Sequence, residues 1–273
     1  MNDASPIFCD YDIGSALQSL AVRQPTAPAI YAPGRLTLNY ADLIAQIRYV
    51  RARLAGWNIA RGDIVAGIVP LRAEMALACA TMPAAATFAP LDSDLTEEGY
   101  AEMYRCLRPK ALACALAPSH PARAAAARLG IAELDLAAHW ERAAGTYTLA
   151  LACARESLGN DAVVPTGTAY VLHGRRTTGP LKLVPVADRR LIRYSRTLWR
   201  WLGRSSSEVG RIFKPLHRAS GLFTQLMAPL LHGASVICLP EADTARRDDN
   251  VDRVGNLIPP AETGTASETA AAG

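Results

Sequence analysis

Hydrophobic positions along the chain alternate between helical and strand spacing. From Tyr40 to Leu54 the apolar residues recur every three or four positions, which predicts a helix, and Asn39 precedes it as a candidate N-cap. Residues 64–69 form a continuous apolar run of the kind found in strands that are buried on both faces of a parallel sheet. Further helices are predicted at 73–85 (with Pro83 ending it early), 97–107, 121–129, 191–202 and 221–231, and further strands at 87–90, 111–115, 131–136, 169–173, 183–186, 212–213 and 234–239.

This alternation predicts an α/β fold with a mostly parallel sheet flanked by helices, followed by an incomplete second α/β subdomain. Residues 151–166 have a weaker pattern and are predicted to be a connection. After Pro240 little remains that a core would bury, which predicts disorder. The predicted division is an N-terminal extension (1–13), a first subdomain (14–160), the beginning of a second (161–240) and a disordered tail (241–273).

Composition excludes several classes of protein. Half of the 273 residues are hydrophobic, which suffices for a sizeable core, and the net charge is only +4. We find no run of Lys and Arg interleaved with aromatic residues of the kind that a nucleic-acid surface would need, so no nucleic-acid partner is expected. The six cysteines are scattered without a CxxC, which predicts reduced thiols, a cytoplasmic location and no metal site.

Two apolar stretches are candidates for a membrane span. Residues 64–91 are interrupted by Arg72 and Glu74, and residues 221–240 contain Gln225 and Pro229. A helix followed by a buried strand explains the second stretch better than a span of about 20 residues. The N-terminus lacks the basic and apolar regions of a signal peptide, so we expect no membrane span.

The segment with the clearest chemistry is residues 169–182, AYVLHGRRTTGPLK. A predicted strand leads into a turn that carries glycines and threonines, and Lys182 follows. Backbone N–H groups and Thr hydroxyls in such a turn can surround an anion, and the lysine adds a point charge for phosphate. Taken alone, this pattern is more often an ordinary loop.

The segment resembles the phosphate-binding loop, roughly T-S-G-T-T-G-x-P-K-G, of the adenylate-forming (AMP-binding) acyl-CoA synthetase and ligase superfamily. Other family-like segments surround it in the family's order. They are LTLNYADL (36–43), GDIVA (62–66), EM (74–75) with APLD (89–92), PLHRASG (215–221) and LLHGASV (230–236). The resemblance covers about residues 14–240 and corresponds to the N-terminal part of the family's large domain.

The resemblance implies ATP with Mg²⁺ as cofactor and a carboxylic acid and CoA as substrates. It assigns an acid pocket to His217, Arg218 and Gly221, and no catalytic residue. It assigns ATP binding to the loop residues Gly174, Arg175, Arg176, Thr177, Thr178, Gly179 and Lys182. His120, His139 and His232 are far apart in the sequence and are interpreted as surface or internally bonded residues.

The chain departs from the family at functional positions. Arg175 and Arg176 stand where the family has Ser and Gly, and Arg218 stands at the family's His, with His217 one place early. The family's Y-G-x-T/S-E segment, ribose-binding Asp and C-terminal lysine domain do not occur before Gly273. We therefore expect a truncated, degenerate ligase-like protein with weak or absent activity. The alternative is a non-catalytic interaction module, or half of a split ligase that needs a partner protein. A neighbouring reading frame with the missing segments would favour a split enzyme or a frameshift.

Overall fold

The computed structural model describes residues 12–70, 72–154, 164–174 and 181–239, and its fold is α/β, as the sequence predicts. The larger sheet has seven strands, and its five inner strands are parallel, with an antiparallel strand at each edge. In order across the sheet they are β7 (Tyr147–Cys153), β6 (Ala132–Ala138), β5 (Ala111–Cys114), β3 (Ile64–Ile68), β4 (Thr87–Pro90), β8 (Thr168–Gly174) and β9 (Lys182–Ala187).

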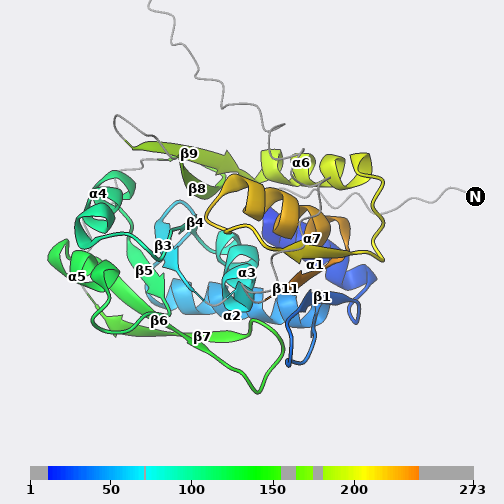
Figure 1. The fold of residues 1–273 in the computed structure, drawn as a ribbon, viewed down its shortest axis with the longest axis horizontal. Helices are drawn as coiled ribbons and strands as arrows, with labels where there is room; N and C mark the ends of the chain where they lie inside the picture. The colour runs from blue at the N-terminus through cyan, green and yellow to red at the C-terminus, as the bar shows by residue number, and fades with distance from the viewer. Residues whose placement is uncertain (1–11, 71, 155–163, 175–180, 240–273) are drawn as a thin grey trace, which may run out of the picture.

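A smaller four-stranded sheet joins segments from the two ends of the described chain (Figure 1). Its order is β10 (Val209–Ile212), β11 (Ser235–Cys238), β1 (Pro28–Tyr31) and β2 (Leu38–Asn39). The strands β10, β11 and β1 run parallel, whereas β2 is antiparallel to β1. Each sheet contains strands from both sides of residue 160. The sheets therefore do not mark a boundary there, and the division into two subdomains stays a prediction.

Helices cover both faces of the seven-stranded sheet (Figure 1). The helices α4 (Glu97–Leu107) and α5 (Pro121–Arg128) pack on one face, and α2 (Tyr40–Gly56) and α3 (Arg72–Thr81) lie on the other, between the two sheets. The remaining helices are α1 (Ile13–Arg23), the 3₁₀ turn η1 (Met82–Ala84), α6 (Asp188–Trp201), the π-helix η2 (Ser220–Met227) and α7 (Ala228–His232).

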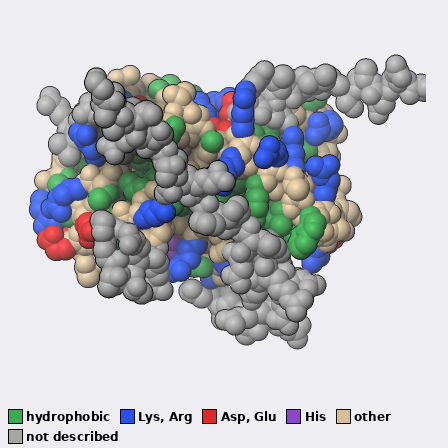
Figure 2. All heavy atoms as spheres, turned by 90° about the horizontal axis from the view of Figure 1, so that it is seen from above, with side chains coloured by type: hydrophobic (Ala, Val, Ile, Leu, Met, Phe, Trp, Pro, Cys, Tyr) green, Lys and Arg blue, Asp and Glu red, His purple; other side chains and the backbone are tan. Residues whose placement is uncertain are grey.

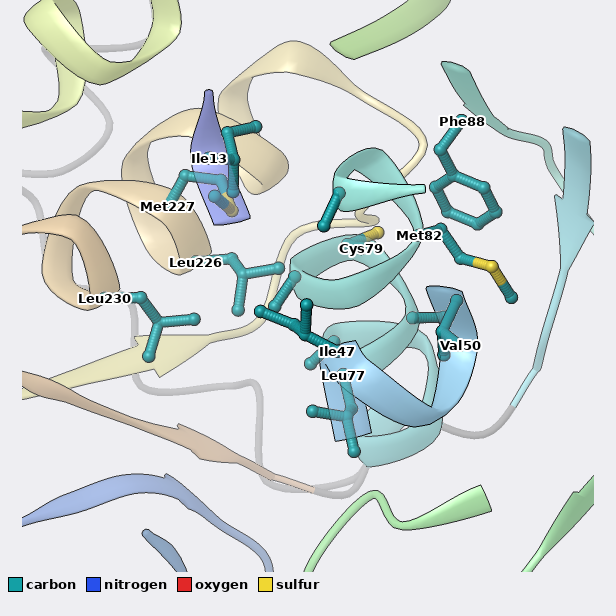
Figure 3. Packing of buried hydrophobic residues seen from close by; sticks show 14 of the residues in the cluster. Ile13, Ile47, Val50, Leu77, Cys79, Met82, Phe88, Leu226, Met227 and Leu230 are labelled. Atoms are coloured by element: carbon teal, nitrogen blue, oxygen red, sulfur yellow. The ribbon is translucent and has the colours of Figure 1, made fainter. Parts of the chain in front are cut away.

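The helix α3 lies at the centre of the core. Its residues from Ala73 to Thr81 are all buried, and four of these nine are alanine, so neighbouring elements can approach it closely. Figure 3 shows Leu77 and Cys79 of α3 beside Ile47 of α2 and Leu226 of η2. Truncation of a buried leucine typically costs about 2–5 kcal/mol, so the packing of Leu77 contributes substantially to the stability of this core.

Local chemistry explains where several elements begin and end. Asn39 is the N-cap of α2 as predicted, and its side chain accepts a hydrogen bond from the backbone N–H of Asp42 at 2.8 Å, within a capping box. The helix α3 ends at Thr81, and Pro83 lies in the 3₁₀ turn that follows it, as its missing N–H predicts.

Two predicted elements need correction. The predicted connection at residues 151–166 is wrong at its start, because Tyr147–Cys153 forms the antiparallel edge strand β7. Only Tyr147 and Leu149 of that strand are fully buried, so its pattern is weaker than that of an inner strand. The predicted helix at 221–231 is instead the π-helix η2 followed by α7. The predicted disordered tail and most of the N-terminal extension lie outside the described residues.

Within the described part of the chain, every helix is too short or too polar to cross a bilayer.

Candidate functional site

A polar cluster lies at the carboxyl ends of two neighbouring strands of the larger sheet. Asp92 follows β4, and His173 lies near the end of β8, which is parallel to β4. His217 comes from the loop between β10 and η2. Its ring stacks on that of His173 with the centroids 5.7 Å apart, and its Nε2 is 3.6 Å from Oδ2 of Asp92. Ligands of open α/β sheets bind at this edge, beyond the carboxyl ends of the strands.

The surroundings of the two imidazoles disfavour their charged form. Burial lowers the pKa of both His173 and His217, and the nearby charge of Arg218 lowers both further, while Asp92 acts in the opposite direction. Nδ1 of His173 is buried and has no hydrogen-bond partner among the described residues. Since buried polar atoms are normally bonded, this nitrogen has hydrogen-bonding capacity that the described residues leave unused.

The predicted phosphate loop begins and ends beside this cluster. Gly174, the residue after His173, lies opposite Lys182 where β8 and β9 pair, so these two residues form the stem of the loop. Lys182 is exposed at the start of β9. The remaining predicted cofactor residues lie outside the described residues, namely Arg175, Arg176, Thr177, Thr178 and Gly179.

The three predicted acid-pocket residues have different surroundings. His217 belongs to the cluster, and Arg218 is exposed but close enough for its charge to affect both imidazoles. Gly221 instead makes a close packing contact, since a Cβ there would lie 2.4 Å from the carbonyl oxygen of Pro215. A glycine is therefore required where the loop turns into η2.

Gln225 of η2 holds the loop between β10 and η2, which carries His217. Its Oε1 accepts hydrogen bonds from the backbone N–H groups of Phe213 and Lys214, at 3.0 and 2.8 Å. The loop that carries His217 is therefore tied both to η2 and, through the stacked rings, to β8.

The sequence assignments did not include His173 or Asp92 among the site residues, although both stood in family-like segments. Each is a polar residue at or just after the end of a buried strand, and that position is the signal that identifies them. The structure thus brings the phosphate-loop stem and the predicted acid-pocket loop together through residues that neither assignment contained.

The chemistry of the cluster suits an anionic ligand. Neutral imidazoles can donate hydrogen bonds to phosphate or carboxylate oxygens, and Lys182 and Arg218 supply positive charge. Among the described residues, no group of three or more His, Cys, Asp or Glu side chains is arranged to hold a metal ion.

Comparison with known proteins identifies the family that the sequence motifs indicate. A family model for AMP-binding enzymes matches residues 17–255. No curated protein sequence matches the chain.

Solved structures share the fold. MatB from Rhodopseudomonas palustris aligns with a TM-score of 0.68 and 21% identity, over 89% of this chain and 47% of that one. The ATP-bound form of MatB aligns with a TM-score of 0.66 and 21% identity, over the same shares of the two chains. The N-terminal subdomain of Klebsiella oxytoca NpsA, in complex with 3-hydroxyanthranilyl-AMSN, aligns with a TM-score of 0.59 and 19% identity, over 84% of this chain and 53% of that one. The chain thus spans about half the length of these structures, and at such identities the likeness shows the fold alone.

Proposed function

The chain belongs to the family of AMP-binding enzymes, and from this premise we propose a ligand for the site. The edge of the sheet around His173 and His217 binds ATP and a carboxylic acid. The observation that carries this proposal is the convergence of two segments far apart in the sequence. The stem of the predicted phosphate loop, Gly174 and Lys182, adjoins the stacked pair of His173 and His217. The reaction would be ATP-dependent activation of the acid, weak or absent in this chain by itself.

The proposed roles follow from charge and position. Lys182 would contact phosphate oxygens, together with the loop residues Arg175 to Gly179. His217 and Arg218 would face the acid, and the permanent charge of Arg218 would favour a carboxylate. Gly221 would act only by allowing the loop to turn. CoA is the acyl acceptor that the family implies.

The described residues fit ATP better than they fit a metal held by the protein. The unpartnered Nδ1 of His173 and the exposed Lys182 suit an anion, whereas no metal-binding cluster occurs among the described side chains. Mg²⁺ would therefore be bound mainly by the phosphates of the nucleotide, and it would neutralise their charge.

Weak activity is proposed because of the two arginines in the loop. A backbone that closely approaches phosphate generally needs glycine, and Arg176 places a Cβ and a long side chain at that position. Arg175 replaces a hydroxyl that would bond a phosphate oxygen.

The test is ATP–pyrophosphate exchange with a panel of monocarboxylic and dicarboxylic acids. We compare the wild-type chain with the double variant Arg175→Ser/Arg176→Gly, which restores the family's residues at these two positions. We expect exchange near background for the wild type and at least about tenfold more for the double variant, the gain of one charge-assisted contact. A wild-type turnover near about 10 s⁻¹, an ordinary enzyme rate, contradicts the proposed degeneracy. No gain in exchange by the double variant with any acid contradicts the attribution of the lost activity to the two arginines.

A second candidate function is an interaction module, or half of a split ligase that a partner chain completes. The observation in its favour is β10, which forms one edge of the smaller sheet in the described part of the chain and exposes Val209. An exposed strand edge can pair with another chain. Coexpression with a neighbouring reading frame that encodes the Y-G-x-T/S-E segment and the lysine domain tests this candidate. Copurification with raised exchange supports it, and separate elution contradicts it.

A further inference from the structure

The helix α6 presents a stripe of arginine side chains at the surface. It has five arginines in its 14 residues. Arg190, Arg193 and Arg200 are exposed, and their spacing of three and seven residues places them on one side of the helix, with the exposed Thr197 between them. The stripe is about 15 Å long, from the rise per residue of an α-helix. Arg189 is exposed beside it, and Arg196 is half-buried.

The opposite side of α6 is fixed to the body of the protein. Leu191, Leu198 and Trp199 are buried, and Nε1 of Trp199 donates a hydrogen bond to the carbonyl oxygen of Ser205 at 3.1 Å. The ring of Tyr194 packs edge-on against Phe223. The stripe is therefore a preformed surface, and it needs no folding step before it binds.

No acidic side chain of α6 neutralises this charge at the surface. The only acidic residue in the helix is Asp188, which is buried, accepts a hydrogen bond from the N–H of Ile13 and pairs with Arg61. The positive charge also reaches His232 at the end of α7. Burial is the largest cause of the lowered pKa of His232, and the charges of Arg200 and Arg196 lower it further. Figure 2 looks down on this face, and Lys and Arg side chains are spread over both halves of the visible surface, including the half where α6 lies.

We propose that this arginine stripe and Trp201 dock the protein on the surface of an anionic lipid bilayer. The stripe is a convex helix side rather than a groove, which suits a flat partner. Trp201 ends the helix and is 68% exposed, and tryptophan is the side chain enriched at the boundary between membrane and water. Each basic residue near an anionic leaflet adds attraction, so the three arginines of the stripe together draw the protein to such a surface.

A nucleic acid is the less suitable partner for this surface. Single-stranded nucleic acids need aromatic faces on which bases stack. Contrary to the expectation from the sequence, the arginines of α6 do alternate with aromatic residues. Trp199 is buried and Tyr194 packs inward, however, so only Trp201 of this helix presents its ring to solvent.

The test is co-flotation of the full chain with vesicles of phosphatidylcholine alone and of phosphatidylcholine with 30% phosphatidylglycerol. The variant Arg190→Gln/Arg193→Gln/Arg200→Gln removes the stripe. The control Arg48→Gln/Arg105→Gln/Arg142→Gln removes the same charge from exposed arginines on other elements. Because all six side chains are exposed, both variants should fold, and circular dichroism verifies this.

We expect binding to the anionic vesicles only, weakened by salt, and about a hundredfold lower affinity for the stripe variant, from the attraction of three basic residues. The control variant should lose much less. Trp201→Ala should weaken binding further at high salt, where the apolar contribution remains. Equal loss in both triple variants, binding to neutral vesicles, or no vesicle binding overturns the proposal. So does tighter binding to a random single-stranded oligonucleotide at the same ionic strength.

Discussion

The two ends of the larger sheet hold buried polar clusters of opposite character. At the amino ends of β3, β4 and β8, Asp188 pairs with Arg61, which also donates to the carbonyl oxygen of Pro83 at 2.8 Å, and Asp188 accepts from the N–H of Ile13 at 3.1 Å. At the carboxyl ends, Asp92 and His217 are 3.6 Å apart, and Nδ1 of His173 has no partner among the described residues.

The difference separates a cluster that stabilises the fold from one that is arranged to bind. Burying charge costs free energy that hydrogen bonds and ion pairs offset, and both carboxylate oxygens of Asp188 have such a partner. The carboxyl-end cluster has a buried nitrogen without a partner among the described residues, imidazoles whose pKa is lowered, and two nearby cations. This is the arrangement expected where a ligand completes the hydrogen bonds. The following predictions test this contrast, beginning with the largest effect.

The largest effect is expected at the amino end. Asp188→Ala leaves Arg61 and the buried N–H of Ile13 without their acceptor, and we expect the free energy of unfolding to fall by about 3 kcal/mol. Urea unfolding measures it. The matched change at the carboxyl end, Asp92→Ala, should cost less than about 1 kcal/mol, because that side chain is partly exposed and its contact with His217 is long. An equal fall in the free energy of unfolding for Asp188→Ala and Asp92→Ala would contradict the distinction between the two clusters.

Substitution of Gly221 and of Gly174 should also change the free energy of unfolding by different amounts. Gly221→Ala forces a Cβ against the carbonyl oxygen of Pro215, and we expect a loss of about 1–3 kcal/mol, as for other overpacked sites. Gly174→Ala has its nearest neighbour at 3.7 Å, and it should change stability by less than about 0.5 kcal/mol. Thermal unfolding of the two variants compares them. Similar melting temperatures would show that the loop carrying His217 adjusts freely.

Lys182→Ala should separate binding from stability. Loss of a charged contact with phosphate should weaken Mg-ATP binding about tenfold, while the unfolding curve stays the same, because Lys182 is exposed. Isothermal calorimetry measures the affinity, with Arg48→Gln as the control for loss of one exposed charge far along the chain. Unchanged affinity would refute the phosphate role of Lys182.

The smallest effect concerns pH. Because folding lowers the pKa of His173 and His217, the unfolded chain binds protons more readily than the folded one. Their contribution to stability is complete above the unfolded pKa of about 6.5 and is lost as the pH falls through the folded values. Unfolding between pH 7.5 and 5 should therefore show a shallower dependence on pH in His173→Gln/His217→Gln than in the wild type. Parallel curves would mean that the two rings are not buried as described.

Most of the inner fold is predictable from the sequence, because strands buried on both faces have continuous apolar runs. The strand β3 and the cap at Asn39 are examples. The edge strand β7 was missed because only its first half is buried. The π-helix could not be anticipated, because the apolar spacing of residues 220–227 does not distinguish it from an α-helix.

The site was predictable only in part. The motifs placed His217 and Lys182 in functional segments, but the stacking of His217 on His173 arises from tertiary packing between a loop and a strand end. Periodicity contains no information about such a contact. Asp92 and His173 became recognisable once the order of the strands placed β4 beside β8.

The most direct test of the central claim is imidazole NMR of the full chain during titration with Mg-ATP, with the five histidines assigned by single His→Gln variants. A ligand at the carboxyl end of the sheet must perturb the rings that lie there. We predict saturable shifts for His173 and His217, with His120, His139 and His232 unchanged. Saturable shifts at the other histidines alone, or no shift in a folded sample at millimolar nucleotide, would contradict the assignment of this edge as the nucleotide site.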